Sequence, residues 1–108
     1  MNLIKFFYPV KEITWTEAET IITENPHENI LIDVRQPEEY NVSRVEGAML
    51  IPIFQLFRRS DELSCEKIIL LYCRSGSRSR LAARILKYKG FDRVFNISGG
   101  ILAYEQYQ

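Results

Sequence analysis

The sequence predicts an α/β fold in which a parallel sheet carries helices on both faces. Short apolar segments alternate with segments of helical character along the chain, which is typical of strands joined by helical crossovers. Two apolar segments, residues 29–34 and 67–72, are nearly continuous runs, as expected for strands that are buried on both faces. The length of 108 residues fits one domain, so we expect residues 1–108 to form a single unit.

The first third of the chain predicts two strands and two helices. A short strand is expected around residues 12–14, and the tetrad Thr16-Glu17-Ala18-Glu19 is typical of a capping box that begins a helix. Pro26 should end that helix. After the buried run at 29–34, Pro37 stands where it favours the first position of a short helix, because its ring fixes a helical φ angle.

The rest of the chain predicts three strands and three helices. In order, these are a turn and short strand at residues 47–52, a helix ending near Ser60, the buried strand at 67–72, a helix from Ser79 to Gly90, a strand at 93–97 and a helix at 101–107. The longest of these helices has a predicted apolar stripe formed by Leu81, Ala82, Ile85, Leu86 and Tyr88. Its beginning should face the residue that ends the preceding strand.

The composition argues against a nucleic-acid partner and shows one local concentration of positive charge. Hydrophobic residues make up 46% and charged residues 26%, as in an average soluble domain, and 14 basic residues balance 14 acidic ones. No nucleic-acid partner is therefore expected. The one local concentration of positive charge comprises Arg74, Arg78, Arg80 and Arg84, and it surrounds Cys73. This concentration indicates a local anion site.

The sequence predicts no membrane partner, metal or cofactor. It contains no run of about 18 apolar residues, and the apolar segment 1–9 is too short for a signal peptide, so we expect a cytoplasmic protein. Two cysteines are too few for a disulfide framework or a zinc site, and the lone His27 is expected at the surface. Cys65 and Cys73 should lie near opposite ends of one strand, which argues against a disulfide between them.

Cys73 is the candidate catalytic residue, because it ends a buried strand and precedes the loop Arg74-Ser75-Gly76-Ser77-Arg78-Ser79. Small residues let the backbone curl so that several N–H groups converge on one point, and a helix begins behind them. Such a loop and its arginines stabilise a thiolate and predict a nucleophile of low pKa. The alternative is a buried packing cysteine, which would need neither the arginines nor the glycine-serine turn.

Three loops are expected to meet at the carboxyl ends of the strands, where open α/β sheets bind their ligands. They carry Cys73, Arg35 and the pair Gly99-Gly100. The preferred interpretation of Asp33 and Arg35 is structural support: the carboxylate accepts hydrogen bonds beneath the loop, and the guanidinium either bonds Glu39 or reaches the cavity.

Four blocks of the chain resemble the single-domain members of the rhodanese-like sulfurtransferase family. They are residues 31–40 (LIDVRQPEEY), residues 47–52 with Gly47-Ala48 and Ile51-Pro52, residues 72–79 (YCRSGSRS) and residues 94–100 (VFNISGG). The resemblance implies a five-stranded parallel sheet with helices on both faces. It also implies that Cys73 takes sulfane sulfur from a donor such as thiosulfate, becomes a persulfide, and passes the sulfur to cyanide or another thiol.

In that scheme the loop residues bind the small anionic donor. Arg78 and Arg74 would orient the oxygens of the donor and stabilise the departing sulfite, although either can instead be a solvated surface charge. The chain departs from the family pattern at Arg44 and Glu46, where a histidine and a proline are usual, and at Tyr104, which is often tryptophan. The first departure puts the local packing and the mouth of the cavity in question.

Four other functions compete with a thiosulfate sulfurtransferase. Cysteine phosphatases need Cys-x5-Arg, whereas Arg78 gives Cys-x4-Arg here and Ser79 stands at the phosphatase position; arsenate reduction needs a second, resolving cysteine. A persulfide carrier that serves one sulfur-accepting protein would have the same loop. A regulatory module that has kept the fold without the chemistry ranks last, because such modules usually lack the cysteine.

Overall fold

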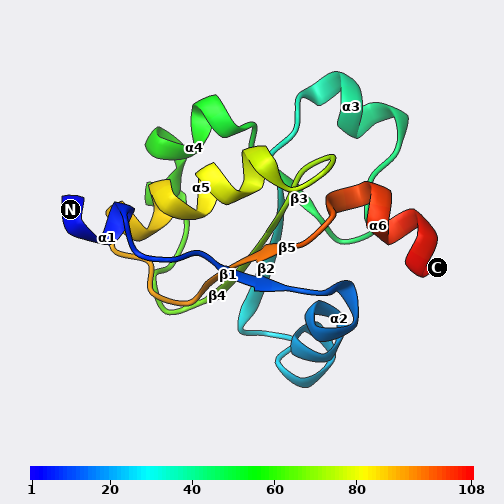
Figure 1. The fold of residues 1–108 in the computed structure, drawn as a ribbon, viewed down its shortest axis with the longest axis horizontal. Helices are drawn as coiled ribbons and strands as arrows, with labels where there is room; N and C mark the ends of the chain where they lie inside the picture. Colours follow the sequence, from blue (N-terminus) through cyan, green and yellow to red (C-terminus); the bar gives the residue numbers. More distant parts are fainter.

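The computed structural model describes all residues, 1–108, and contains one sheet of five parallel strands (Figure 1). The strands are β1 (Lys11–Ile13), β2 (Asn29–Asp33), β3 (Met49–Leu50), β4 (Ile68–Tyr72) and β5 (Val94–Ile97). Their spatial order is β1-β5-β4-β2-β3, and every neighbouring pair is parallel. β4 therefore lies in the middle and is buried along its whole length. The predicted fold class is confirmed.

Helices cover both faces of the sheet and create two cores. The helices are α1 (Leu3–Phe6), α2 (Trp15–Glu24), α3 (Pro37–Val42), α4 (Ile53–Arg59), α5 (Ser77–Tyr88) and α6 (Gly100–Tyr107), with a 3-10 turn at Ser60–Glu62. On one face, α4 and α5 pack over side chains that include Ile32, Ile69 and Leu71. On the other, α2 and α6 pack over side chains that include Leu70 and Tyr72 (Figure 1). This alternation explains the continuous apolar run of β4.

The predicted start of α2 was wrong by two residues. The capping box is formed by Thr14 and Glu17: the Thr14 hydroxyl accepts the Glu17 N–H at 3.1 Å, and the Glu17 carboxylate accepts the Thr14 N–H at 2.9 Å. The helix consequently begins at Trp15, whose indole is buried. Thr16 lies inside the first turn, so the expected box from Thr16 to Glu19 does not form.

α5 begins at Ser77, two residues before the predicted start. Gly76 adopts φ +115°, a left-handed conformation that glycine tolerates, and this turn brings the chain into the helix early. The predicted apolar stripe needs one correction, because the Leu81 side chain is 47% exposed. The buried face instead includes Ser79, which points toward Cys73.

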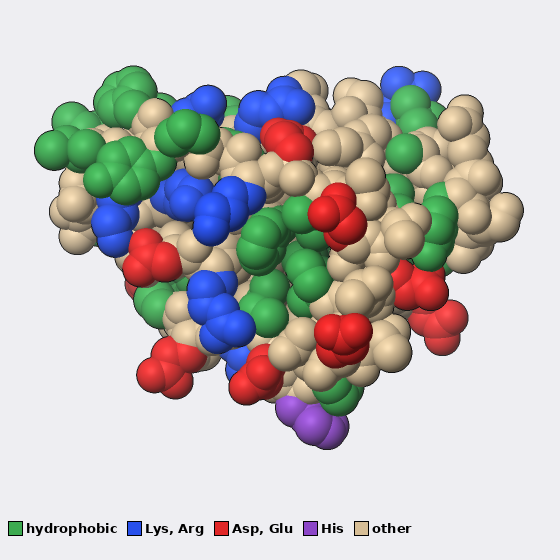
Figure 2. Space-filling model, turned by 60° about the horizontal axis from the view of Figure 1, so that its bottom comes forward, with side chains coloured by type: hydrophobic (Ala, Val, Ile, Leu, Met, Phe, Trp, Pro, Cys, Tyr) green, Lys and Arg blue, Asp and Glu red, His purple; other side chains and the backbone are tan.

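The N-terminal segment attaches to α5 and leaves apolar side chains in solvent. The Asn2 N–H donates to the Tyr88 carbonyl at 3.0 Å, and the Arg84 guanidinium donates to the Phe6 carbonyl at 3.1 Å. Figure 2 shows a group of hydrophobic side chains, with lysine and arginine beside them, at the end of the molecule where this segment lies. No helix in the structure is both long and apolar enough to cross a membrane.

Candidate active site

Cys73 follows the last residue of β4, and its sulfur lies inside a ring of hydrogen-bond donors. The Gly76 N–H donates to Sγ at 3.1 Å, and the N–H and the hydroxyl of Ser79 each donate at 3.4 Å. Because the loop closes over the sulfur, Cys73 is only 1% exposed. The predicted convergence of donors on the thiol is present, and Ser79 supplies two of them.

The hydrogen-bond donors around Sγ outweigh burial in their effect on the pKa of Cys73. Burial alone would raise the pKa of Cys73, since a thiolate is poorly solvated inside the protein. Hydrogen bonds from the Ser79 hydroxyl and from the N–H groups of Ser79, Gly76 and Ser75 hold the pKa of Cys73 below its ordinary value. The loop thus favours the nucleophilic form.

The start of α6 holds the outer side of the loop. The Ile101 N–H donates to the Cys73 carbonyl at 2.9 Å, and the Leu102 N–H donates to the Arg74 carbonyl at 3.2 Å. A methyl group at Gly100 would lie 2.4 Å from the Cys73 carbonyl oxygen, so this approach requires glycine. The predicted meeting of the Gly99-Gly100 turn with the cysteine loop is therefore observed.

Asp33 and Arg35 form a buried network beneath the neighbouring loop. The Arg35 guanidinium donates to the Asp33 carboxylate at 2.7 Å and to the Ser43 carbonyl at 2.6 Å. The Tyr72 hydroxyl also donates to Asp33, at 2.7 Å, and accepts the Val45 N–H. Burial and the Asp33 carboxylate raise the pKa of Tyr72, which keeps the hydroxyl protonated. Asp33 therefore accepts hydrogen bonds from two side chains beneath the loop, and the supporting role of Asp33 and Arg35 stays a prediction.

Arg78 pairs with Glu39, an ion pair that the sequence analysis did not foresee. Nη1 and Nη2 of Arg78 donate to the two oxygens of Glu39 at 2.7 and 2.9 Å. The hydrogen bonds from the Arg78 guanidinium outweigh the effect of burial and lower the pKa of the Glu39 carboxyl to about 2. Of the two alternatives for Arg35, the bond to Glu39 does not form, because α3 presents this carboxylate to α5, whereas the Arg35 side chain does line the depression beside the loop.

The four arginines around Cys73 do not form one anion site. Arg78 is bound to Glu39, Arg80 donates to Glu12 at 2.8 Å, and Arg84 bonds carbonyl groups of the N-terminal segment. Arg74 is exposed and makes no side-chain hydrogen bond. Of the predicted cationic cluster, Arg74 alone has a guanidinium without a protein partner.

Two polar residues behind the loop, Asn96 and Glu12, were not among the predicted site residues. The Asn96 amide, buried in β5, donates to the Gly76 carbonyl at 3.1 Å and to the Glu12 carboxylate at 3.0 Å. These bonds tie the back of the loop to β5 and to β1. The available signal was an asparagine within an otherwise apolar strand, because a buried amide needs partners.

A depression of about 360 Å³ lies beside the loop, between α3 and α6. Its lining includes two arginines, Arg35 and Arg74, and three carboxylates, from Glu38, Glu39 and Glu105. Ser75 and Ser77, which follow Arg74 in the loop, are exposed. A molecule that enters the depression thus meets more negative than positive side chains.

The remaining residues singled out in the sequence lie away from this chemistry. Cys65 is free and exposed, and His27 is exposed. Arg44 packs over the Tyr40 ring, with its guanidinium carbon 4.6 Å from the ring centroid, and so does not reach the cysteine loop. Glu46 is exposed, and Tyr104 packs against Trp15 with ring centroids 4.8 Å apart.

Residues 14–107 match the family of the rhodanese-like domain. A protein of Allochromatium vinosum named "Sulfurtransferase" is 33% identical over 72% of this chain and 73% of its own length. "Putative sulfur carrier protein YrkF" of Bacillus subtilis is 38% identical over 66% of this chain and 38% of its own length. This chain spans 38% to 56% of the length of the two Bacillus subtilis relatives that it matches.

The fold is also similar to that of a solved structure from the same class. The crystal structure of a rhodanese-like domain protein from Staphylococcus aureus is 27% identical and superposes with a TM-score of 0.79. The superposition covers 88% of this chain and 91% of that protein.

Proposed function

Because this chain belongs to the rhodanese-like domain family, we propose that Cys73 transfers sulfane sulfur through a persulfide. The family and the sulfurtransferase relative support sulfur transfer in general. The observation that carries the proposal is the set of three donors at 3.1 to 3.4 Å from Sγ, which can stabilise negative charge on sulfur before and after transfer.

The sulfur donor in this proposal is a small anion such as thiosulfate, and the acceptor is cyanide or another thiol. The Cys73 thiolate attacks the outer sulfur of thiosulfate, a new S–S bond forms, the old one breaks, and sulfite leaves with the bonding electron pair. Cyanide then attacks the terminal sulfur of the persulfide, and the electrons of the broken S–S bond restore the thiolate. The reaction needs no cofactor, because sulfur itself supplies the electron pairs.

The loop residues divide the work in this scheme. Gly76 and Ser79 hold the charged sulfur, and the exposed Arg74 is available to attract the oxygens of the donor. Ser75 and Ser77 complete the small-residue loop that lets the N–H groups converge. Arg78 can help only after it exchanges Glu39 for the donor.

Thiocyanate formation from thiosulfate and cyanide tests the proposal. Cys73→Ser should abolish turnover, because the serine hydroxyl is not a sulfur nucleophile at neutral pH. Cys65→Ser is the matched control, since that thiol is exposed and distant from the loop, and it should turn over normally. Activity in Cys73→Ser, or loss of activity in Cys65→Ser alone, would contradict the assignment.

A second candidate, a persulfide carrier for one protein partner, is favoured by the charges beside the loop. Glu38, Glu39 and Glu105 outnumber Arg35 and Arg74 in the lining of the depression and so disfavour a small dianion, and Glu39 also engages Arg78. The similarity to YrkF supports a sulfur-accepting protein as partner. A carrier would show slow turnover of thiosulfate, yet would accept and donate sulfur rapidly with a protein persulfide or thiol.

A phosphatase and a purely regulatory module are less well supported. The Cys-x4-Arg spacing forms a ring that fits closely around one sulfur atom, and the arginine at its end points to Glu39.

We further propose that residues 1–108 act as one rhodanese-like domain and that the protein works in the cytoplasm, where a reduced thiol persists. Proteolysis and cell fractionation test these two statements.

A further inference from the structure

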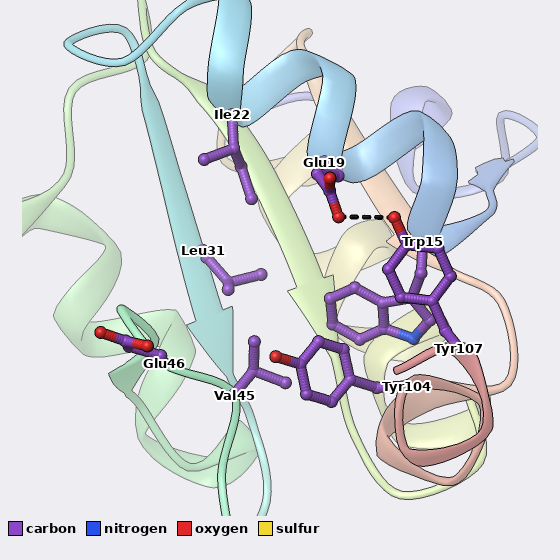
Figure 3. A pocket seen from close by; sticks show the side chains of 8 residues that line it. All are labelled: Trp15, Glu19, Ile22, Leu31, Val45, Glu46, Tyr104 and Tyr107. Carbon is purple, nitrogen blue, oxygen red and sulfur yellow. Dashed lines mark hydrogen bonds between the residues drawn. The ribbon is translucent and has the colours of Figure 1, made fainter.

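A second cavity, of about 260 Å³, lies on the face of the sheet opposite α5, between α2, α6 and the segment before β3 (Figure 3). Aliphatic side chains form its floor, and Trp15, Tyr104 and Tyr107 form an aromatic wall on one side. Figure 3 shows that the indole of Trp15 and the ring of Tyr104 point toward the same space. The sulfur-transfer scheme uses none of these rings.

The aromatic wall is held in a fixed arrangement. The rings of Trp15 and Tyr104 are 4.8 Å apart at their centroids, with an interplanar angle of 59°. The Trp15 Nε1–H donates to the Gly100 carbonyl at 2.8 Å, and the Tyr107 hydroxyl donates to the Glu19 carboxylate. These bonds fix the indole and the phenol through their polar ends. Trp15 is only 6% exposed and also packs against Tyr72, so the ring surface open to the cavity belongs mainly to Tyr104 and Tyr107.

The charged groups of the cavity are all negative. Glu19 lies beside the aromatic wall and Glu46 at the opposite edge, and no lysine or arginine lines the cavity (Figure 3). Glu46 makes no side-chain hydrogen bond or ion pair, and one oxygen of Glu19 has no partner. An anion would be repelled here, whereas a purely apolar ligand would leave both carboxylates unused.

We propose that this cavity binds an organic cation, an alkylated ammonium group, against the rings of Tyr104 and Tyr107 beside the buried Trp15. Aromatic faces carry negative potential and attract such cations, and the alkyl groups match the aliphatic floor. Glu19 and Glu46 add long-range attraction that an uncharged ligand would not feel. The same group can come from a small free molecule or from a methylated lysine of a partner protein. The proposal is independent of the chemistry at Cys73.

Trp15 is the only tryptophan of the chain, so tryptophan fluorescence reports on the surroundings of this one indole, which borders the cavity. We expect choline to change the Trp15 emission saturably, and its uncharged carbon analogue, dimethylbutanol, to bind about tenfold more weakly because it lacks the cation. Calorimetry on the same solutions detects binding that leaves the emission unchanged. No binding of choline by either method, or equal binding of the uncharged analogue, would overturn the proposal.

Variants test whether the carboxylates act as described. Glu19→Gln keeps an oxygen to accept the Tyr107 hydroxyl but removes the charge, and Glu46→Gln removes the charge at the opposite edge; each should weaken choline binding several-fold. Glu24→Gln, on α2 but outside the cavity, is the matched control and should bind choline like the wild type. Equal binding by all three variants would contradict the electrostatic argument.

A second ligand distinguishes the two possible sources of the cation, a small free molecule and a methylated lysine of a partner protein. A short peptide with one trimethylated lysine is compared with choline and with the same peptide carrying alanine. Tighter binding of the methylated peptide than of choline supports a protein ligand, and tighter binding of choline supports a free molecule. Binding of the alanine peptide as tightly as the methylated one would overturn the role of the cation.

Discussion

Glu39→Gln should make this protein a better thiosulfate sulfurtransferase. In the wild type, both terminal nitrogens of Arg78 are occupied by the Glu39 carboxylate, at 2.7 and 2.9 Å. An amide in place of the carboxylate carries no charge and binds the guanidinium less tightly, so an anionic donor can take its place. The amide oxygen can still accept the Gln36 N–H, now bonded at 3.0 Å, so the start of α3 is preserved.

The size of the effect follows from the bond that Arg78 gains. A hydrogen bond to a charged group contributes about 1.5 to 3 kcal/mol. The side chains of Arg78 and Glu39 are 35% and 29% exposed, so solvent screening places the gain near the lower end. A gain of about 1.4 kcal/mol corresponds to an approximately tenfold rise in kcat/KM for thiosulfate.

Initial rates of thiocyanate formation over a range of thiosulfate concentrations measure this change. Glu38→Gln is the matched control, because Glu38 lines the same depression but does not bond Arg78. The reasoning is refuted if kcat/KM stays constant or falls in Glu39→Gln. An equal rise in Glu38→Gln would assign the effect to the net charge of the depression and not to the ion pair.

The same variant has a defined effect on acid stability. The pKa of Glu39 is about 2 in the folded protein, against an ordinary value of 4.5, because the Arg78 guanidinium stabilises the carboxylate. A depressed pKa adds stability above the ordinary pKa, and this contribution is lost as the pH falls from about 4.5 toward about 2. Wild type and Glu39→Gln should therefore differ in free energy of unfolding near neutral pH and converge in acid. A difference that persists unchanged in acid would contradict the pairing.

Three further substitutions, with Gly47→Ala as a control, test the support of the cysteine loop. Gly100→Ala should lower the free energy of unfolding in urea by about 3 kcal/mol, because its methyl group meets the Cys73 carbonyl oxygen at 2.4 Å and φ is +54°. Gly47→Ala has the left-handed strain, at φ +85°, but open space, and should cost about 1 to 2 kcal/mol; equal losses would contradict the close approach. Asp33→Asn should cost about 3 kcal/mol or more in thermal unfolding, because it leaves the Arg35 guanidinium buried without its counterion, and a near-neutral change would argue against the network. Ser79→Ala should raise the pKa of Cys73, measured as the midpoint of alkylation rate against pH, and an unchanged midpoint would remove the Ser79 hydroxyl from the account.

The strands and the cysteine loop could be predicted because their signals are local. The continuous apolar run before Cys73 requires burial on both faces, and the small residues after it permit the tight turn. Helix starts were less secure: Thr14 and Thr16 both offer a capping hydroxyl, and the choice between them depends on burying Trp15 against α6. That contact joins distant parts of the chain, so the local pattern could not decide it.

The partners of the charged residues depended on the fold. Glu39 lies four residues from Arg35, and this spacing suggested a pair within one turn. The actual partner is Arg78, 39 residues away, because the fold places this side chain of α5 beside Glu39 of α3, while Arg35 turns inward to Asp33. The Asn96 amide behind Gly76 is a similar case, since its partners lie on other strands and loops. Long-range pairing of this kind is fixed by packing and not by spacing in the sequence.

The central claim, a persulfide on Cys73, is tested most directly by mass spectrometry of the intact protein before and after incubation with thiosulfate. We expect wild type and Cys65→Ser to gain the mass of one sulfur atom, mapped to the fragment that contains Cys73, and to lose it on addition of cyanide. Cys73→Ser should gain none. A sulfur atom carried on Cys65, or a gain that persists in Cys73→Ser, would contradict the account.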